Sequence, residues 1–201
     1  WYVPHDVKSL INLIGERQFI DRLNAGFATS EKVSFNALGD NMGAYPINHG
    51  NETNMQAAYL FSYTSEPWHT QKWARAIQEK YYGMGPRDAY PGDEDQGQMS
   101  SWYILSSIGL FQMDGGCGKD PVWLLGSPRF DRVEILLDNT YYSGKKLIIK
   151  AENVSKDNCY IQYVRFNNKR LSNNYIEWSK LKKGGTLHFI MGDRPNPNAF
   201  K

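Results

Sequence analysis

The chain has 201 residues, of which 41% are hydrophobic and 22% charged, so it should bury a core as one large domain or two small ones. The net charge of +2 comes without a basic run of the kind that binds nucleic acid, and no apolar run is long enough to span a bilayer. The chain starts at Trp1 without a methionine or a signal peptide. This start indicates a fragment whose missing N-terminal part would carry any targeting information.

Two helices are predicted near the start of the chain. Asp6 is a plausible N-cap, and apolar residues recur at helical spacing from residue 10 to residue 14 before Gly15 interrupts the pattern. Residues 16–27 then predict a second helix with an apolar side. His5 has two interpretations: it is a site residue, or it is a partly buried histidine bonded to a backbone group.

Longer polar loops separate the next helices. Residues 29–45 show no period and predict a loop, whereas residues 55–63 and 69–82 carry apolar stripes that predict helices. A glycine-bearing loop at residues 83–88 follows. Long loops inside a compact domain are commonly functional, so these loops are the first places to look for a site.

A dense polar cluster precedes the helix predicted at residues 55–63. His49, Asn51 and Glu52 stand together there and could bind a ligand or a metal ion. The alternative is that Asn51 or Thr53 only caps the helix. Capping accounts for one of these polar residues, so the cluster remains a candidate site.

A second cluster consists of three consecutive acids. Asp93, Glu94 and Asp95 follow the turn signal Pro91-Gly92, and an apolar run from Trp102 onward predicts a helix over residues 95–108. Acids are favoured at a helix N-terminus by capping and by the helix dipole, which is the simplest interpretation. A helix needs only one acidic residue as its cap, however, and three consecutive acids stand here.

The character of the sequence changes near residue 112. We assign residues 1–112 to a helical part and residues 113–201 to a β-rich supporting part in which no chemistry is evident. Alternating runs punctuated by turn signals predict strands in an antiparallel β-sandwich at residues 133–137, 147–150, 160–166 and 187–191. Cys117 and Cys159 lack a CxxC or zinc spacing, and whether they pair is open.

The acidic stretch does not form an EF-hand. Gly97 already occupies the fifth position of such a loop, and Ile104 stands where the twelfth-position glutamate belongs. Calcium could still be bound by distributed oxygen ligands from Asn51, Glu52 and Asp95. The four histidines show no HExxH spacing, which argues against zinc.

Paired carboxylates in an aromatic-rich chain are what glycoside hydrolysis requires. One carboxylic acid protonates the leaving oxygen and a second carboxylate activates water or attacks the sugar. Aromatic residues make up 14% of the chain, and flat rings suit both sugar stacking and an ordinary core. The alternative from another class is a non-catalytic carbohydrate-binding module that uses Trp68, Trp102 and tyrosines as platforms.

Five motifs stand in the order seen in glycoside hydrolase family 92, and together they cover nearly the whole chain. The chain therefore resembles this family, whose members are calcium-dependent, inverting α-mannosidases abundant in gut Bacteroidetes. Thr53 departs from the family pattern, which commonly has proline there. The motifs are Trp1-Tyr2-Val3-Pro4-His5-Asp6-Val7, His49-Gly50-Asn51-Glu52, residues 81–86, residues 92–103 and Gly126-Ser127-Pro128-Arg129-Phe130-Asp131.

The resemblance implies an α+β fold: the late helices of an (α/α)6 barrel, followed by β-sandwich strands. It implies a longer exo-α-mannosidase that acts on terminal α-linked mannose of glycans, with α-1,2 linkages expected. The N-terminal remainder of the polypeptide would complete the enzyme, and a periplasmic or secreted location is expected.

The resemblance also implies roles for individual residues. Asp95 is the expected catalytic base, assisted by Asp93, and the general acid would be a glutamate preceding Trp1. Calcium is expected as the cofactor, with Asn51, Glu52 and Asp95 as its ligands. The expected substrate-binding residues are His49, Glu52, His5 and Trp102.

Overall fold

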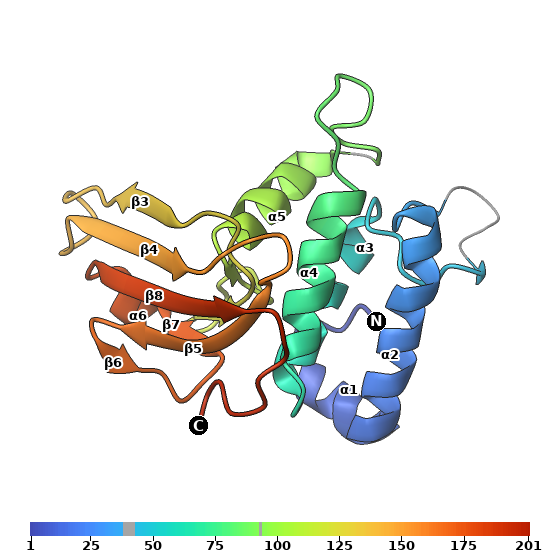
Figure 1. Ribbon diagram of the computed structural model, residues 1–201, viewed down its shortest axis with the longest axis horizontal. Helices are drawn as coiled ribbons and strands as arrows, with labels where there is room; N and C mark the ends of the chain where they lie inside the picture. Colours follow the sequence, from blue (N-terminus) through green and yellow to red (C-terminus); the bar gives the residue numbers. More distant parts are fainter. Residues whose placement is uncertain (38–42, 93) are drawn as a thin grey trace. The chain divides into compact units, whose positions relative to one another are not determined.

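The computed structural model describes residues 1–37, 43–92 and 94–201. They form two compact units, Trp1–Ile104 and Leu105–Lys201. The boundary between the units lies inside helix α5 (Gln98–Ser107). The first unit is helical and the second is built on strands, as Figure 1 shows, which confirms the expected α+β class.

The first unit contains helices joined by long loops, and these helices form no closed barrel in the described residues. Asp6 caps the first helix as predicted, because its carboxylate accepts a hydrogen bond from the Ser9 amide at 3.1 Å. Gly15 has a φ of +88° and separates the first two helices. The elements are α1 (Val7–Ile14), α2 (Glu16–Ser30), η1 (Glu31–Val33), α3 (Glu52–Met55), η3 (Gln56–Tyr63), α4 (Trp68–Lys80), η4 (Asp95–Gly97) and α5.

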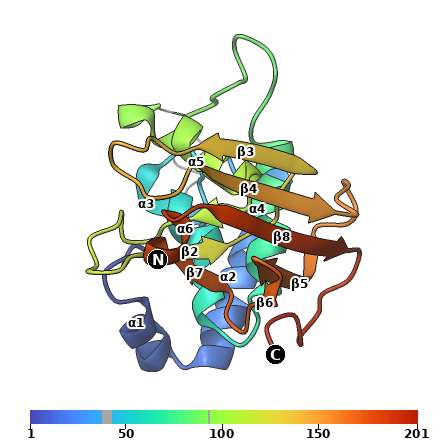
Figure 2. The same ribbon diagram turned by 90° about the vertical axis from the view of Figure 1, so that its left-hand side faces the viewer.

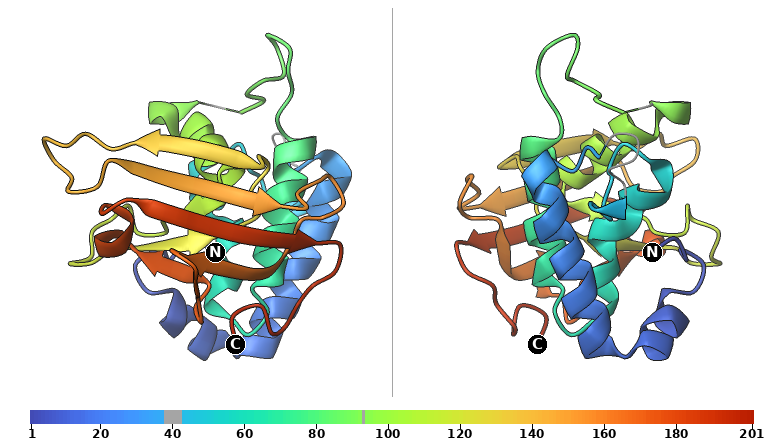
Figure 3. Two further views of the ribbon diagram at one scale, coloured as in Figure 1. Left: turned by 60° about the vertical axis from the view of Figure 1, so that its left-hand side comes forward. Right: turned by 90° about the vertical axis from the view of Figure 1, so that its right-hand side faces the viewer.

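The core of the helical unit is aromatic. Phe27 of α2 stacks on Trp73 of α4 with ring centroids 5.3 Å apart, and it also meets the rings of Phe35 and Phe61. The Trp73 indole donates a hydrogen bond to Asn24 at 2.8 Å, so its one polar atom is satisfied inside the core. These contacts tie α2, α4 and η3 together and hold the loops between them (Figure 3, right).

Two helical segments differ from the prediction in the type of helix that they form or begin with. Residues 56–63 form a 3₁₀ helix rather than an α-helix, and its residues are nearly all buried. The helix predicted at residues 95–108 starts with the 3₁₀ turn η4, in which Gln96 has a left-handed φ of +57°. Apolar periodicity identifies a helical segment but does not report the tight backbone turns at its ends.

The second unit is a two-sheet sandwich around one apolar core. The three-stranded sheet has the order β1-β2-β7 and the five-stranded sheet the order β3-β4-β8-β5-β6 (Figure 2). Both sheets contribute to the core, for example through Leu125, Ile176, Ile149 and Phe189. The elements are β1 (Leu110–Phe111), β2 (Val122–Leu125), β3 (Arg132–Leu136), β4 (Lys146–Glu152), β5 (Tyr160–Phe166), β6 (Lys169–Arg170), β7 (Tyr175–Glu177), α6 (Trp178–Leu181) and β8 (Gly185–Gly192).

One feature of the sheet corrects the prediction. Strands β4 and β8 pair in parallel, with Ile149 opposite Leu187, so the larger sheet is mixed rather than purely antiparallel. Figure 3 (left) shows β4 and β8 running side by side in the same direction. The alternation of apolar and polar residues specifies which face of a strand is buried, and it carries no information on strand direction.

Candidate active site

The loop that precedes α3 carries the first polar cluster. Asn51 is the N-cap, and its side-chain oxygen accepts a hydrogen bond from the Thr53 amide at 3.2 Å, which confirms the capping interpretation for this residue. Glu52 is the first residue of α3, and its Oε1 atom is buried without a hydrogen-bond partner among the described residues. A buried carboxylate oxygen of this kind requires a cation or a donor from elsewhere.

His49 is fully buried, with an exposed fraction of 0%, among three aromatic residues. The ring centroid of His49 lies 4.3 Å from that of Trp102, 5.0 Å from that of Tyr81 and 5.5 Å from that of Tyr82. We call these four residues the His49 cluster. It connects the first polar loop to the C-terminal end of α4 and to α5.

Hydrogen bonds fix the tautomer of His49. The Tyr82 hydroxyl donates to the carbonyl oxygen of Met99 at 3.1 Å, so it accepts from Nε2–H of His49, 2.8 Å away. The other ring nitrogen, Nδ1, is then unprotonated, and it is buried without a partner in the part of the chain that the structure describes. The indole nitrogen of Trp102, a residue with an exposed fraction of 2%, is likewise buried without a hydrogen-bond partner among the described residues.

Burial sets the charge state of the His49 cluster. Removal from water disfavours the charged imidazolium and lowers the pKa of His49 to about 3. Burial is also the main reason that the pKa of the Tyr82 hydroxyl is raised, with neighbouring tyrosines and Glu94 adding to the effect. Both groups are therefore neutral at physiological pH and serve as hydrogen-bonding supports rather than as charges.

Two glycines bring the acidic stretch against the first polar loop. A Cβ atom added to Gly92 would lie 2.6 Å from the Cα atom of Gly50, and one added to Gly50 would lie 2.4 Å from the Tyr81 hydroxyl oxygen. No side chain larger than hydrogen fits at either position without a shift of these atoms. The polar loop at residues 48–52 and the loop that carries the acids therefore meet at this point.

Glu94 holds the turn from which Asp95 projects. Its carboxylate accepts hydrogen bonds from the Ser100 amide at 3.1 and 3.2 Å, and also from the Ser100 hydroxyl. Gln96 and Gly97 both adopt positive φ values, of 57° and 75°, which folds the chain back between the two partners. Asp95 is left exposed on this turn.

We expect loss of the Glu94–Ser100 contact to loosen the first turn of α5. Ser100→Ala should lower the local free energy of opening by about 1–2 kcal/mol, because the carboxylate loses its hydroxyl donor. The measurement is amide hydrogen exchange of a peptide covering residues 98–104. Ser101→Ala is the matched control, since Ser101 is an exposed serine on the same helix turn. Equal exchange in the two variants would contradict this role for Glu94.

The structure places the predicted site residues unevenly. It brings His49 and Trp102 into ring contact, and it puts Asn51 and Glu52 at the start of α3. His5 is exposed in the turn before α1, and Asp93 lies outside the described residues. The sequence did not indicate the role of Tyr82 or the contact between Gly50 and Gly92. It also did not indicate the supporting role of Glu94, although Glu94 lies inside the motif at residues 92–103.

The donor atoms available for calcium are of the right chemical type. Carboxylate and amide oxygens are the ligands that calcium prefers, and the buried, unpartnered Oε1 atom of Glu52 fits a cation. The side-chain oxygen of Asn51 is already engaged by Thr53. No group of three or more His, Cys, Asp or Glu residues suited to a metal occurs within residues 1–37, 43–92 and 94–201. A calcium site would therefore need amide, backbone or sugar oxygens, or Asp93.

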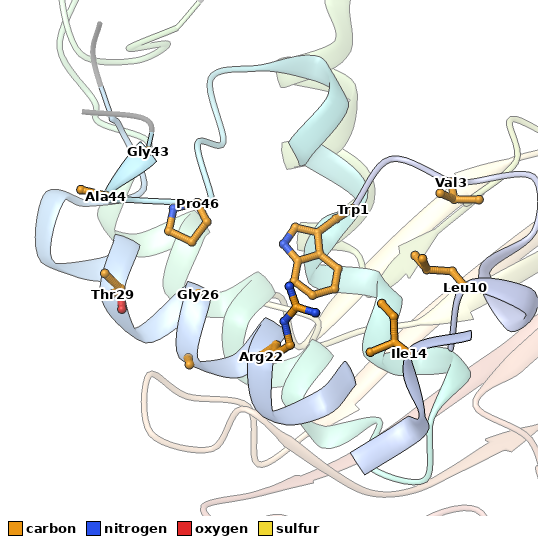
Figure 4. A pocket seen from close by; sticks show the side chains of 11 residues that line it. Trp1, Val3, Leu10, Ile14, Arg22, Gly26, Thr29, Gly43, Ala44 and Pro46 are labelled. Carbon is orange, nitrogen blue, oxygen red and sulfur yellow. The ribbon is translucent and has the colours of Figure 1, made fainter. Parts of the chain in front are cut away.

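A separate pocket lies at the start of the chain. Figure 4 shows Trp1 and Arg22 at its centre, with Leu10, Ile14 and Pro46 also among the lining residues. Trp1 is held there by an edge-on contact with Phe19, at 5.4 Å between ring centroids. Its described lining residues include no acid, so none of them offers a carboxylate for acid–base chemistry.

This chain is similar to known proteins over nearly its whole length. The Glycosyl hydrolase family 92 catalytic domain matches residues 1–193. A protein of Arthroderma benhamiae named as an uncharacterized secreted glycosidase is 29% identical over 195 residues, which are 96% of this chain and 22% of that protein. No helix within the described ranges has the length and apolar character that a membrane span requires.

Solved structures match over the same range. The family GH92 α-mannosidase BT3965 of Bacteroides thetaiotaomicron, in complex with mannoimidazole, is 32% identical with a TM-score of 0.84 over 100% of this chain. The inverting mannosidase BT2199 of the same organism is 30% identical with a TM-score of 0.80 over 100% of this chain. The chain spans 26% and 27% of those two structures, about a quarter of each. By its sequence and its fold, this chain belongs to glycosyl hydrolase family 92.

Proposed function

We propose that this chain supplies the base side of the active site of an exo-acting α-mannosidase. The observation that carries the proposal is the meeting of the acidic loop with the His49–Glu52 loop at Gly50 and Gly92. The similarity to a mannosidase that binds mannoimidazole supports mannose as the sugar. The expected substrates are mannose-containing glycans, and the measured linkage preference decides between α-1,2 and other linkages.

The proposed reaction is a single displacement with inversion, as the name of the related mannosidase BT2199 describes for that enzyme. In such a reaction, one carboxylate removes a proton from a water molecule while an acid protonates the leaving oxygen. We assign the base to Asp95, because it is exposed on a turn held by Glu94 and Ser100. Asp93 is the proposed assistant, and the general acid comes from outside these 201 residues.

Calcium is the proposed cofactor, held by Glu52, Asn51 and Asp95. When bound, it supplies a hard cation that ligates sugar hydroxyls and favours a distorted ring. The His49 cluster supports the loop that carries Asn51 and Glu52, and the direct contacts to the sugar then fall to Glu52 and to the exposed residues. A periplasmic or secreted location is proposed, supported by the name of the Arthroderma relative.

The test is α-mannoside hydrolysis by the full-length protein, with calcium and then with excess EDTA. We expect release of mannose from the non-reducing end of α-linked mannobioses, with most of the activity removed by EDTA and restored by added calcium. A parallel assay of residues 1–201 alone should show no turnover until the N-terminal part is added. Hydrolysis that is insensitive to EDTA would remove calcium from the proposal, and a full-length protein without any mannosidase activity would overturn it.

A further inference from the structure

The loop between α4 and the acidic stretch, residues 83–92, has a braced tip. The Gly83 amide donates to the carbonyl oxygen of Asp88 at 2.8 Å, and the Gly85 amide donates to the Asp88 carboxylate at 2.7 Å. The Ala89 amide closes the turn on the Gly85 carbonyl oxygen at 3.1 Å. These bonds give an exposed loop a defined shape, so a side chain on it is presented in a fixed position.

The base of this loop is fixed to the candidate active site at two points. Gly92 packs directly on Gly50, which adjoins His49. Two residues before Gly92, the ring of Tyr90 meets the ring of Tyr82 edge to face, with centroids 6.4 Å apart. Tyr82 in turn holds His49, so Tyr90 is joined to both polar loops of the site.

Tyr90 is nevertheless about half exposed to solvent, with an exposed fraction of 47%. By contrast, Tyr81 and Trp102 of the His49 cluster are 3% and 2% exposed. A tyrosine that is supported on one side and open on the other offers an apolar ring and a polar hydroxyl to a ligand. A sugar has matching chemistry, because its ring has an apolar face and its edges carry hydroxyl groups.

We propose that Tyr90 is the platform of a leaving-group subsite, on which the sugar that follows the hydrolysed mannose stacks. This inference rests on the proposed function. In an exo-acting enzyme the carboxylates surround the terminal sugar, and the next sugar lies towards the open side of the site. Tyr90 is exposed on the loop that delivers the acids, five residues before Asp95, and its ligand class is a pyranose leaving group.

The experiment compares two substrates of the full-length protein that differ only in the leaving group. An α-linked mannobiose has a sugar as its leaving group, whereas the leaving group of α-mannosyl fluoride is a fluoride ion. We expect Tyr90→Ala to lower the ratio of kcat/KM for mannobiose to kcat/KM for the fluoride roughly tenfold, mainly through KM. Tyr90→Phe should keep the ratio within about twofold of wild type, because it retains the ring.

A matched control is Tyr141→Ala, which removes a tyrosine that is 78% exposed in the β-rich unit. Its substrate ratio should equal that of wild type. Equal losses on both substrates in Tyr90→Ala, or an unchanged ratio, would overturn the subsite while leaving the proposed function in place. A wild-type protein inactive on both substrates would instead overturn the proposed function, and the subsite with it.

Discussion

Replacement of Asp95 by asparagine in the full-length protein is expected to lower kcat for α-mannoside hydrolysis roughly 10³-fold, the loss typical for a missing general base. Asparagine preserves the shape of the side chain and cannot accept a proton from water. The substitution should leave the fold intact, because Asp95 is exposed and the turn around it is held by Glu94 and Ser100. The measurement is the initial rate of mannose release at saturating substrate.

The control for this prediction is Asp157→Asn, which removes an exposed aspartate from the β-rich unit and should retain the wild-type rate. Thermal unfolding and circular dichroism of Asp95→Asn should match those of wild type. Turnover near the wild-type rate would exclude Asp95 as the base and transfer that role to Asp93. Loss of activity together with loss of fold would show that the carboxylate is needed for structure.

Features of the fold that depend on residues close together in the sequence were predictable. Asp6 and Asn51 cap helices as expected, because a cap needs only a short polar side chain within three residues of a free amide. Strand β5 begins and ends where the alternation predicts. The parallel pairing of β4 with β8 was not predictable, because a period of two residues does not encode strand direction.

The candidate site was predictable as two motifs but not as one arrangement. Each polar cluster was visible in the sequence, yet the contact that joins them is between Gly50 and Gly92, which have no side chains to attract attention. Tyr82 looked like the last residue of a helix, and its hydrogen bond to His49 spans 33 positions. Contacts of this length depend on how α4 packs, which local periodicity does not specify.

The second prediction concerns acid. Because His49 has a pKa of about 3 in the folded protein against an ordinary value of 6.5, the unfolded state binds one more proton between these two pH values. The contribution of the neutral, buried His49 is therefore fully present above pH 6.5 and is lost progressively as the pH falls towards 3. At about 1.4 kcal/mol per pH unit, the local free energy of opening should fall by about 2 kcal/mol between neutral pH and pH 5.

Hydrogen exchange of a peptide covering residues 47–63 measures this effect in the full-length protein, once intrinsic exchange rates at each pH have been corrected. His49→Gln removes the titrating group, and its protection should vary less between pH 7 and pH 5 than that of wild type. His5→Gln removes an exposed histidine and should retain the wild-type change. Equal corrected protection of the wild-type peptide at both pH values would show that a protonated His49 is tolerated inside its aromatic cluster.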